Sequence, residues 1–287
     1  MHVANAEGNN LVGTLPVEMK LLSKMVDLVI VNNKIRGTLP VAFGENAESL
    51  RSLLLPDNDL TGRIPENYLS NSPLEFVHLG NNALSGPIPR NIGNTMYLRQ
   101  IDLSGNSITG TILEEIGGFK SLEALSLADN KLQGSVPIEI YNMTSLKFLH
   151  LNGNKLTGTI SSSIGGLSSL KELRLGGSEL SGYIPDELYS LTNLVEIDIS
   201  QANFVGRISL GFLNLKNLEK LVVSDNELGG IIPSSLGRLS TLSDLNLQGN
   251  NFFGAIPESV CLLREGKLEV LTADCKDLLC NCCTMCF

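Results

Sequence analysis

The chain of 287 residues is rich in leucine and glycine, has no tryptophan and contains only 18% charged residues, a composition that excludes a disordered protein and fits a packed apolar core. Its net charge of −9 and its lack of a basic tract argue against a nucleic-acid-binding protein, because a polyanion is bound by clustered Lys and Arg. No apolar run approaches the roughly 18–20 residues of a membrane-spanning helix, and the amino terminus lacks the features of a signal peptide.

One repeat of 24 residues accounts for almost the whole chain. The segment 74–89, LEFVHLGNNALSGPIP, aligns position for position with the segment 122–137, LEALSLADNKLQGSVP, and both fit the template LxxLxLxxNxLxGxIP. Self-similarity at a fixed period predicts a solenoid of stacked repeats, in which each repeat buries its apolar faces against its neighbours. The Asn position of the template, with a single step of 25 residues, is occupied by Asn9, Asn33, Asn58, Asn82, Asn106, Asn130, Asn154, Ser178, Ala202, Asn226 and Asn250.

Each template position has a structural role. The LxxLxL segment, such as Leu146, Leu149 and Leu151, alternates as a short strand with one buried face. The Asn follows this strand, and its amide is expected to satisfy buried backbone groups in a turn and to stack into a ladder. The Gly four residues later, present from Gly13 to Gly254 in all eleven copies, provides backbone freedom or close approach. The Ile-Pro pair is expected to end regular pairing before a short outer helix.

Three departures from the template carry expectations of their own. Met1 falls on the first Leu position of a repeat, so we expect the chain to begin inside the solenoid, as a fragment without an amino-terminal cap. Ser178 can still bond locally in place of the ladder amide, whereas Ala202 cannot, which predicts the weakest seam at Ala202. The template Pro, and with it the turn punctuation, is replaced in three copies, by Leu113, Ser161 and Ser209.

The LxGxIP segment after the Asn resembles the plant-specific class of leucine-rich repeats, and the resemblance covers nearly the whole chain. It implies an α/β repeat solenoid, a right-handed superhelix with a parallel β-sheet on the concave face and short helical or 3-10 turns on the convex face. Residues 1–266 are then about eleven repeats. Residues 267–287 are a cysteine-rich carboxyl-terminal cap that resembles those of algal leucine-rich-repeat proteins. The class includes receptor-kinase ectodomains, receptor-like proteins and secreted inhibitors, which implies an extracellular or cell-surface location.

The cysteines are confined to the last 27 residues. Such clustering in an extension with little core of its own predicts disulfides and an oxidising compartment. Fifteen pairings are possible, and the positions of Cys261 before and Cys275 after the last expected strand favour a bridge between these two. The rival interpretations are a zinc site, which no nearby histidine supports, and free structural thiols; we expect no metal and no cofactor. The disulfide candidates are Cys261, Cys275, Cys280, Cys282, Cys283 and Cys286.

The solvent-facing positions of the expected strands define a candidate ligand surface. Phe76 and Phe148 occupy equivalent positions, each two residues before a His, and aromatic residues and Arg commonly anchor interfaces. A basic spot at Lys147, Lys171 and Arg174 would steer an acidic group of the partner. The candidate ligand-binding residues on the concave face are Phe76, His78, Asp102, Phe148, His150 and Arg174. A neighbouring column predicts cross-strand ion pairs of structural value only, and runs through Arg51, Glu75, Arg99, Glu123, Lys147 and Lys171.

These features predict a non-catalytic recognition module with a protein, peptide or polysaccharide ligand on the concave face, and without nucleic acid or membrane contact by this segment. Some peptide-hormone receptors of the class carry an RxR pair where this chain has Glu172 and Arg174, so a hormone ligand is not specifically predicted. The alternatives are a structural cell-surface or wall component and a hydrolase. The hydrolase is disfavoured because no His lies between Ser126 and Asp102 in the column. A sequon at Asn142 is a glycosylation candidate if the protein is secreted.

Overall fold

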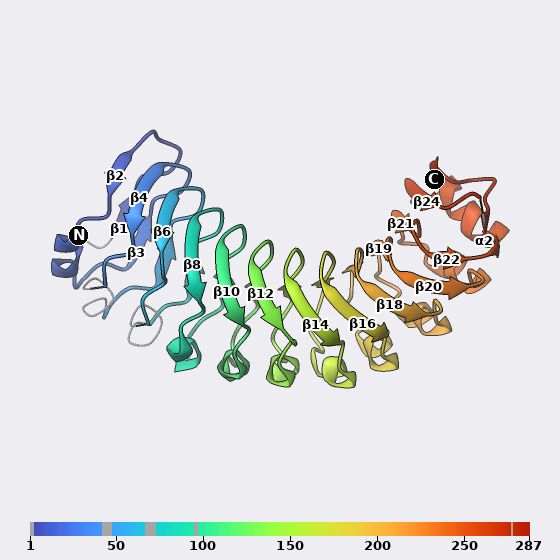
Figure 1. Cartoon of the computed structure of the whole chain (residues 1–287), viewed down its shortest axis with the longest axis horizontal. Helices are drawn as coiled ribbons and strands as arrows, with labels where there is room; N and C mark the ends of the chain where they lie inside the picture. Colours follow the sequence, from blue (N-terminus) through green and yellow to red (C-terminus); the bar gives the residue numbers. More distant parts are fainter. Residues whose placement is uncertain (1–2, 42–47, 67–72, 95–96, 277) are drawn as a thin grey trace. The chain divides into compact units, whose positions relative to one another are not determined.

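The computed structural model describes the chain except for residues 1–2, 42–47, 67–72, 95–96 and 277. The chain divides into two compact units, residues 1–146 and 147–287. Within each unit, a fully described repeat contributes a short strand to an inner sheet, a strand to a second sheet and a helical turn (Figure 1). The predicted fold class, an α/β repeat solenoid with parallel strands and short helical turns, is confirmed.

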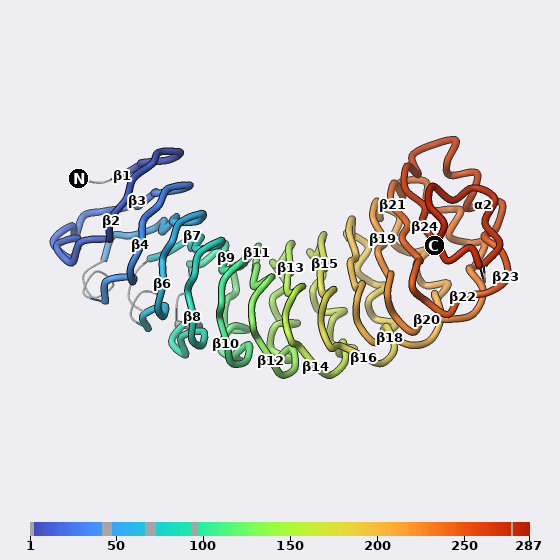
Figure 2. The backbone as a smooth tube through the Cα atoms, turned by 45° about the horizontal axis from the view of Figure 1, so that its top comes forward, coloured from blue at the N-terminus to red at the C-terminus, as the bar shows by residue number. Residues whose placement is uncertain are grey.

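The inner strands form at LxxLxL, and from β3 (Asp27–Val29) to β17 (Glu196–Asp198) and in β21 (Asp244–Asn246) the central apolar residue is buried while its two neighbours are partly exposed. Leu149, for example, is 1% exposed, whereas Phe148 and His150 on either side are half-buried. All the pairings are parallel, and Figure 2 shows the strands side by side within each unit. In the first unit the inner strands are β1 (Val3–Asn5), β3 (Asp27–Val29), β5 (Ser52–Leu54), β7 (Phe76–His78), β9 (Gln100–Asp102) and β11 (Ala124–Ser126). In the second unit they are β13 (Phe148–His150), β15 (Glu172–Arg174), β17 (Glu196–Asp198), β19 (Lys220–Val222), β21 (Asp244–Asn246), β24 (Val270–Ala273) and β26 (Met285–Cys286).

A second parallel sheet, which the sequence did not predict, follows the Asn of each repeat. Its strands bury the next template Leu, such as the fully buried Leu156, and expose the residues beside it. The strands of the first unit are β2 (Val12–Thr14), β4 (Lys34–Thr38), β6 (Asp59–Gly62), β8 (Ala83–Pro87), β10 (Ser107–Thr111) and β12 (Lys131–Gly134). Those of the second unit are β14 (Lys155–Thr159), β16 (Glu179–Tyr183), β18 (Asn203–Gly206), β20 (Glu227–Gly230) and β22 (Asn251–Phe252), with a separate pair β23 (Gly254–Ala255) and β25 (Leu278–Leu279).

The turns on the outer side are mostly 3-10 helices. Where Ser replaces the template Pro, the hydroxyl caps the turn: Ser161 Oγ accepts from the Ser163 N–H at 3.2 Å and Ser209 Oγ from the Gly211 N–H at 3.0 Å. The expectation that these two copies lose their turn signal is therefore wrong. The helices are η1 (Val17–Leu21), η3 (Arg90–Asn94), η4 (Glu114–Gly118), η5 (Ile138–Asn142), η6 (Ser162–Gly166), η7 (Asp186–Ser190), η8 (Leu210–Asn214), η9 (Ser234–Arg238), α2 (Glu258–Cys261) and η10 (Leu262–Glu265).

The template Asn side chains link neighbouring repeats. Asn130 Oδ1 accepts from the Ile108 N–H at 2.9 Å, and its Nδ2 donates to the carbonyl oxygens of Leu103, Leu127 and Ala128 at 2.9–3.2 Å. Amides with the same kinds of partner occur at Asn33, Asn58, Asn82, Asn106, Asn226 and Asn250. Asn33, Asn58, Asn130, Asn154 and Asn226 are buried, whereas Asn82, Asn106 and Asn250 are half-buried.

The Asn ladder is interrupted in the second unit. Ser178 is buried, and its hydroxyl donates to the Leu175 carbonyl at 2.8 Å. Ala202, one repeat later, has no polar side-chain atom with which to replace the amide. Ser178 thus keeps a local bond and Ala202 keeps none from its side chain, which is the basis for expecting the weakest seam at Ala202.

The invariant Gly is required for two physical reasons, which Gly182 illustrates. Its φ is +84°, a conformation that residues with a Cβ rarely adopt. A Cβ built at Gly182 would also lie 2.9 Å from Thr159 Cγ2, because the residue after the Gly of one repeat lies over the Gly of the next. Close packing of successive repeats therefore depends on this position.

No helix within the described ranges has both the length and the apolar character that crossing a bilayer requires.

Candidate ligand-binding surface

In the first unit, the candidate residues lie on β7 and β9. Phe76 and His78 are half-buried on the solvent-facing side of β7, on either side of the fully buried Val77. His78 Nε2 lies 3.2 Å from Gln100 Oε1 on β9. Asp102 pairs in register with His78, but its Oδ1 accepts from the Ser104 N–H and Oγ at 2.9 and 2.6 Å. His78 and Asp102 thus lie on adjacent strands, each with a polar partner of its own, and Phe76 lies on the same strand as His78.

The hydrolase hypothesis depended on a column that holds Asp102 and Ser126. These residues are register neighbours on β9 and β11, but Asp102 is engaged by Ser104. His78 is paired with Gln100 instead of with a hydroxyl or a carboxylate. A nucleophilic triad needs the imidazole between the two other groups. The described residues of the first unit do not have that arrangement.

In the second unit, Phe148 and His150 lie on β13, with their ring centroids 6.4 Å apart in an edge-on arrangement. His150 Nε2 is 3.0 Å from Glu172 Oε2 on β15. Arg174, on the same strand, contacts Glu172 at 3.0 Å and Glu196 on β17 at 2.8 Å. This half-buried aromatic side chain thus stands beside a chain of charged groups.

The charged groups continue along the sheet. Lys220 Nζ on β19 lies 3.1 Å from Glu196 Oε1, so Arg174 and Lys220 share one carboxylate. Burial acts to raise the pKa of Glu196, but the hydrogen bonds and the positive charges of Arg174 and Lys220 together outweigh it, so the pKa is lowered. We refer to His150, Glu172, Arg174, Glu196 and Lys220 as the ion-pair network. Sequence reasoning singled out His150 and Arg174 but missed Glu196 and Lys220, which the 24-residue period places one and two strands further on.

The predicted cross-strand ion pairs on the neighbouring column are confirmed in the first unit. Arg51 pairs with Glu75 and Arg99 with Glu123, each across adjacent repeats. Half or more of each arginine side chain is exposed to solvent. Exposed pairs contribute little to stability, so this column has a structural and solubilising role.

The pKa of His150 lies below its ordinary value of 6.5, because burial disfavours the imidazolium and Arg174 repels it, against the attraction of Glu172 and Glu196. As the pH falls through 6.5, the unfolded chain therefore binds a proton on His150 before the folded chain does, and the free energy of unfolding decreases. We expect the free energy of unfolding to decrease from pH 7 to pH 5, and to decrease less steeply in His150→Gln. Urea unfolding at a series of pH values measures this; equal slopes in the two proteins would contradict it.

Asp244 on β21 has an unfavourable environment at neutral pH. Burial raises its pKa, and so do Glu196 and Asp198, although Lys220 opposes them. Its Oδ1 is buried without a hydrogen-bond partner among the described residues. We expect Asp244→Asn to stabilise the chain at pH 7 by up to about 1 kcal/mol, since solvent screens a half-buried charge. Asp198→Asn is the matched control, because Asp198 Oδ1 already accepts two hydrogen bonds from Ser200. Thermal unfolding that shows equal effects in the two variants would refute this.

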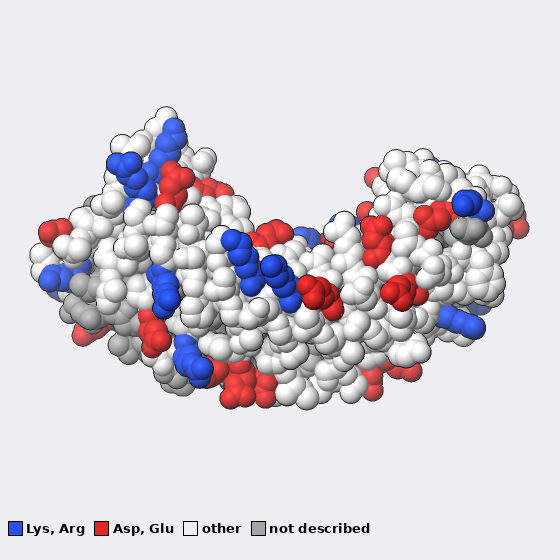
Figure 3. Space-filling model, in the orientation of Figure 1, with Lys and Arg blue, Asp and Glu red and all other residues white. Residues whose placement is uncertain are grey.

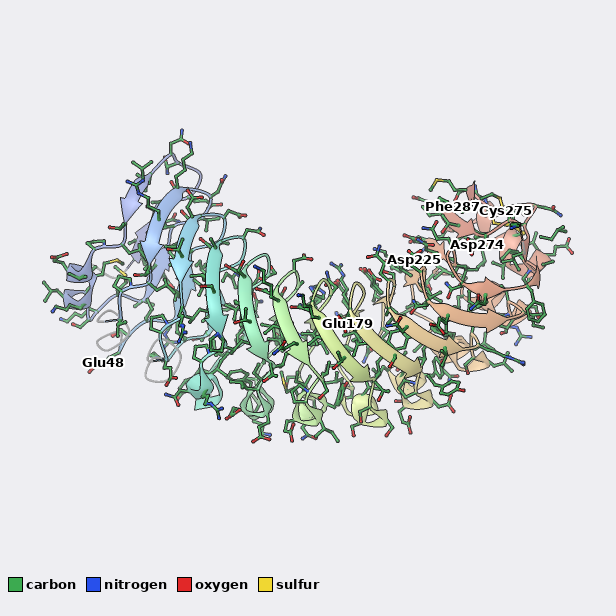
Figure 4. All side chains as sticks on the ribbon, in the orientation of Figure 1. Glu48, Glu179, Asp225, Asp274, Cys275 and Phe287 are labelled. Carbon is green, nitrogen blue, oxygen red and sulfur yellow. A yellow bond between two sulfur atoms is a disulfide. The ribbon has the colours of Figure 1, made fainter. Side chains whose placement is uncertain are left out.

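The carboxyl-terminal tail is closed by three disulfides, which use all six cysteines: Cys261–Cys282, Cys275–Cys286 and Cys280–Cys283. Strand β26 adds to the inner sheet beside β24, with Cys286 opposite Ala273, and Phe287 N donates to the Ala273 carbonyl. Figure 4 shows Cys275 and Phe287 close together at this end of the chain. The division of the tail from the repeats at residue 266 stays a prediction.

The expected bridge between Cys261 and Cys275 is wrong. Cys261 ends α2 on the outer side, whereas Cys275 follows β24 at its far end, and a four-residue strand is about 13 Å long. Cys275 instead meets Cys286 across the added strand. The sulfur atoms of Cys275, Cys283 and Cys286 lie within 4.8 Å of one another, but each is bonded in a disulfide, which leaves no free thiolate for zinc.

The comparisons with known proteins agree with this architecture. The family model "Leucine-rich repeat region" matches residues 74–229, more than half of the chain, and the model "Leucine Rich Repeat" matches residues 241–263. A probable LRR receptor-like serine/threonine-protein kinase of Arabidopsis thaliana is 35% identical over 75 residues. That match covers 26% of this chain and only 7% of the kinase.

Solved structures of plant receptors match over nearly the whole chain. The LRR ectodomain of the Arabidopsis receptor kinase HAESA, in complex with an N-terminally extended IDA peptide hormone, has a TM-score of 0.89 and 34% identity, over 95% of this chain and 46% of that one. The ectodomain of GASSHO1/SCHENGEN3 from Arabidopsis thaliana, in complex with CASPARIAN STRIP INTEGRITY FACTOR 2, has a TM-score of 0.82 and 28% identity, over 98% and 36%. The chain thus spans less than half the length of these receptor chains. From the repeat pattern, the parallel sheets and these matches, the chain belongs to the leucine-rich repeat family.

Proposed function

We propose that the chain is an extracellular, non-catalytic recognition module that binds a peptide or protein segment on the inner sheet of its second unit. The observation that carries this proposal is the half-buried Phe148 beside the ion-pair network on β13, β15, β17 and β19. An aromatic side chain at the solvent face of a strand has no core to fill, and aromatic residues with Arg are the usual anchors of interfaces.

The charges of the network define what a partner must provide. Arg174 is already paired with Glu172 and Glu196, so an acidic group of the partner must compete with two carboxylates. The Nε of Arg174 is buried and has no partner among the described residues. Successive strands are about 4.8 Å apart, so a short extended segment can reach the aromatic ring and several charges together. This combination fits a polar peptide better than a uniform polymer.

Other features support the extracellular setting and the kind of ligand. Three disulfides in a short tail are typical of proteins from oxidising compartments. Of two similar ectodomains, one was solved with the IDA peptide hormone and the other with CASPARIAN STRIP INTEGRITY FACTOR 2. In the first unit, Phe76, His78 and Asp102 have a related arrangement and form a second candidate surface. A wall component without a specific ligand remains the alternative, and the experiment below distinguishes the two.

Asn142 supports the same setting. It is exposed at the end of η5, on the outer side, and the Thr144 N–H of the sequon donates to its carbonyl at 3.1 Å. We expect a secreted form of the protein to carry an N-glycan there, away from the inner sheet.

The proposed function is tested by selecting ligands from a displayed library of random peptides with the purified, disulfide-bonded chain. We expect enriched peptides that bind the chain with measurable affinity by calorimetry. The double variant Phe148→Ala, Arg174→Ala is the counter-selection protein, and enriched peptides should bind it more weakly. If no peptide is enriched over an unrelated repeat protein of the same charge, the recognition proposal fails and the structural alternative is favoured.

A further inference from the structure

A groove of about 470 Å³ lies in the first unit, on the side formed by the second sheet and the outer turns, away from the inner-sheet residues discussed above. Its walls come from three successive repeats, at β8, β10 and the turns that follow β6 and β8. Sites for small molecules commonly have volumes of about 300–1,000 Å³. The groove is therefore large enough for a small organic ligand.

Two arginines line this groove. Arg63 and Arg90 are both exposed, and neither forms an ion pair or a side-chain hydrogen bond within the described part of the chain. The Arg63 side chain lies over Gly86, where its Cγ is 2.8 Å from the position that a Cβ would take. Figure 3 shows basic side chains with an acidic one between them near the lower end of β6 and the turn below β8. A guanidinium group is a hydrogen-bond donor only, and two such groups match the oxygens of a carboxylate.

The other walls add apolar contact and one acceptor. Pro65, Pro87 and Pro89 line the groove. Pro87 follows the template Gly, and no other repeat has a Pro at that position. The carboxylate of Glu66 receives a hydrogen bond from Asn91 Nδ2 at 3.3 Å and has acceptor capacity left. A compact inorganic anion such as sulfate has no apolar face to contact these prolines and no hydroxyl to donate to Glu66.

We propose that this groove binds a hydroxylated ring carboxylate, the chemistry of a uronic acid. The carboxylate would pair with Arg63 and Arg90, a ring hydroxyl would donate to Glu66, and the CH face of the ring would lie against the prolines. Such a ligand could be a free sugar acid or a residue of an acidic polysaccharide, because both present the same group. The site is independent of the peptide-binding surface, and either proposal can fail alone.

The second unit offers a matched control. Arg207 occupies the same template position as Arg63, and its side chain lies over Gly230 in the same way, with its Cγ 3.1 Å from the Cβ position. The residue that corresponds to Arg90 is Ser234, and that to Pro87 is Ile231. Arg207 therefore has the same charge as Arg63 and packs over a Gly in the same way, but it has no arginine at the position of Arg90 and no Pro at the position of Pro87 beside it.

The test is calorimetric titration of the full chain with galacturonate and with trigalacturonate, alongside galactose as the uncharged probe. We expect binding of one or both acidic probes and none of galactose. Binding of the monomer assigns the site to free sugar acids, and binding of the trimer alone assigns it to a polymer. In Arg63→Gln and in Arg90→Gln, affinity should fall at least about tenfold, as for loss of a charged hydrogen bond. In Arg207→Gln, affinity should change less than about twofold.

Two results would overturn the proposal. One is the absence of binding of either acidic probe at millimolar concentration to the folded chain. The other is an equal loss in Arg207→Gln, which would show a diffuse charge effect in place of a built groove. All three arginines are exposed, and thermal unfolding of each variant checks that the fold is retained.

Discussion

Replacing Asn130 with Ala is expected to destabilise the chain by about 2–4 kcal/mol, because several buried backbone groups lose a hydrogen-bond partner at once. Asn130 is 8% exposed, and its amide joins four backbone groups of two neighbouring repeats. The Ile108 N–H is left without the Oδ1 acceptor, and a buried polar group that loses its hydrogen bond is costly. Equilibrium unfolding in urea measures the difference in the free energy of unfolding.

The interrupted ladder provides the reverse experiment. Ala202→Asn restores the template amide one repeat after Ser178, and we expect it to stabilise the chain. Asn130→Ala removes the template amide and Ala202→Asn adds it, so opposite effects on stability would show that the amide itself is responsible. A cost below about 0.5 kcal/mol for Asn130→Ala would mean that the ladder is not a source of stability.

Removing the disulfide Cys261–Cys282 is the second large change that we expect. The two residues are 21 positions apart, so the double variant Cys261→Ser, Cys282→Ser frees a long loop and should cost about 3 kcal/mol. The physical reason is that the bridge restricts the unfolded chain and also ties α2 to the tail. Chemical denaturation under non-reducing conditions measures the loss.

The disulfide Cys280–Cys283 provides the control for this prediction. It spans only three positions, so its removal should cost distinctly less. Peptide mapping by mass spectrometry under non-reducing conditions should recover the three observed pairs. Recovery of a Cys261–Cys275 pair, or an equal cost for both removals, would contradict this account of the cap.

Much of the fold follows from the repeat itself. The Leu spacing predicts the inner strands, and the equal steps between Asn positions predict their parallel stacking. The second sheet could not be predicted in the same way, because a positive φ at each Gly, such as +84° at Gly182, interrupts the alternation that marks a strand. The pairing of Cys275 with Cys286 depends on β26, a two-residue strand whose sequence carries no strand pattern.

The candidate surface shows a similar limit. Reading two template positions across the repeats identified Phe148 in one and His150 and Arg174 in the other. The contact of Arg174 with Glu196, however, joins the two positions on adjacent strands. To predict such a diagonal contact one must know the register of the strands and the side-chain conformations, and the residues at a single template position give neither. The groove at Arg63 and Arg90 was missed for the same reason, since its walls come from three repeats.

The central claim is that the second-unit inner sheet recognises a ligand, and one affinity measurement tests it most directly. A peptide enriched on the wild-type chain is titrated into Phe148→Ala, Arg174→Ala and into Thr157→Ala, Ser181→Ala, a matched double variant on the second sheet of the same unit. We expect the first variant to bind at least about 2 kcal/mol more weakly and the second to bind as the wild type does. Unchanged affinity in the first variant, or an equal loss in the second, would contradict the account.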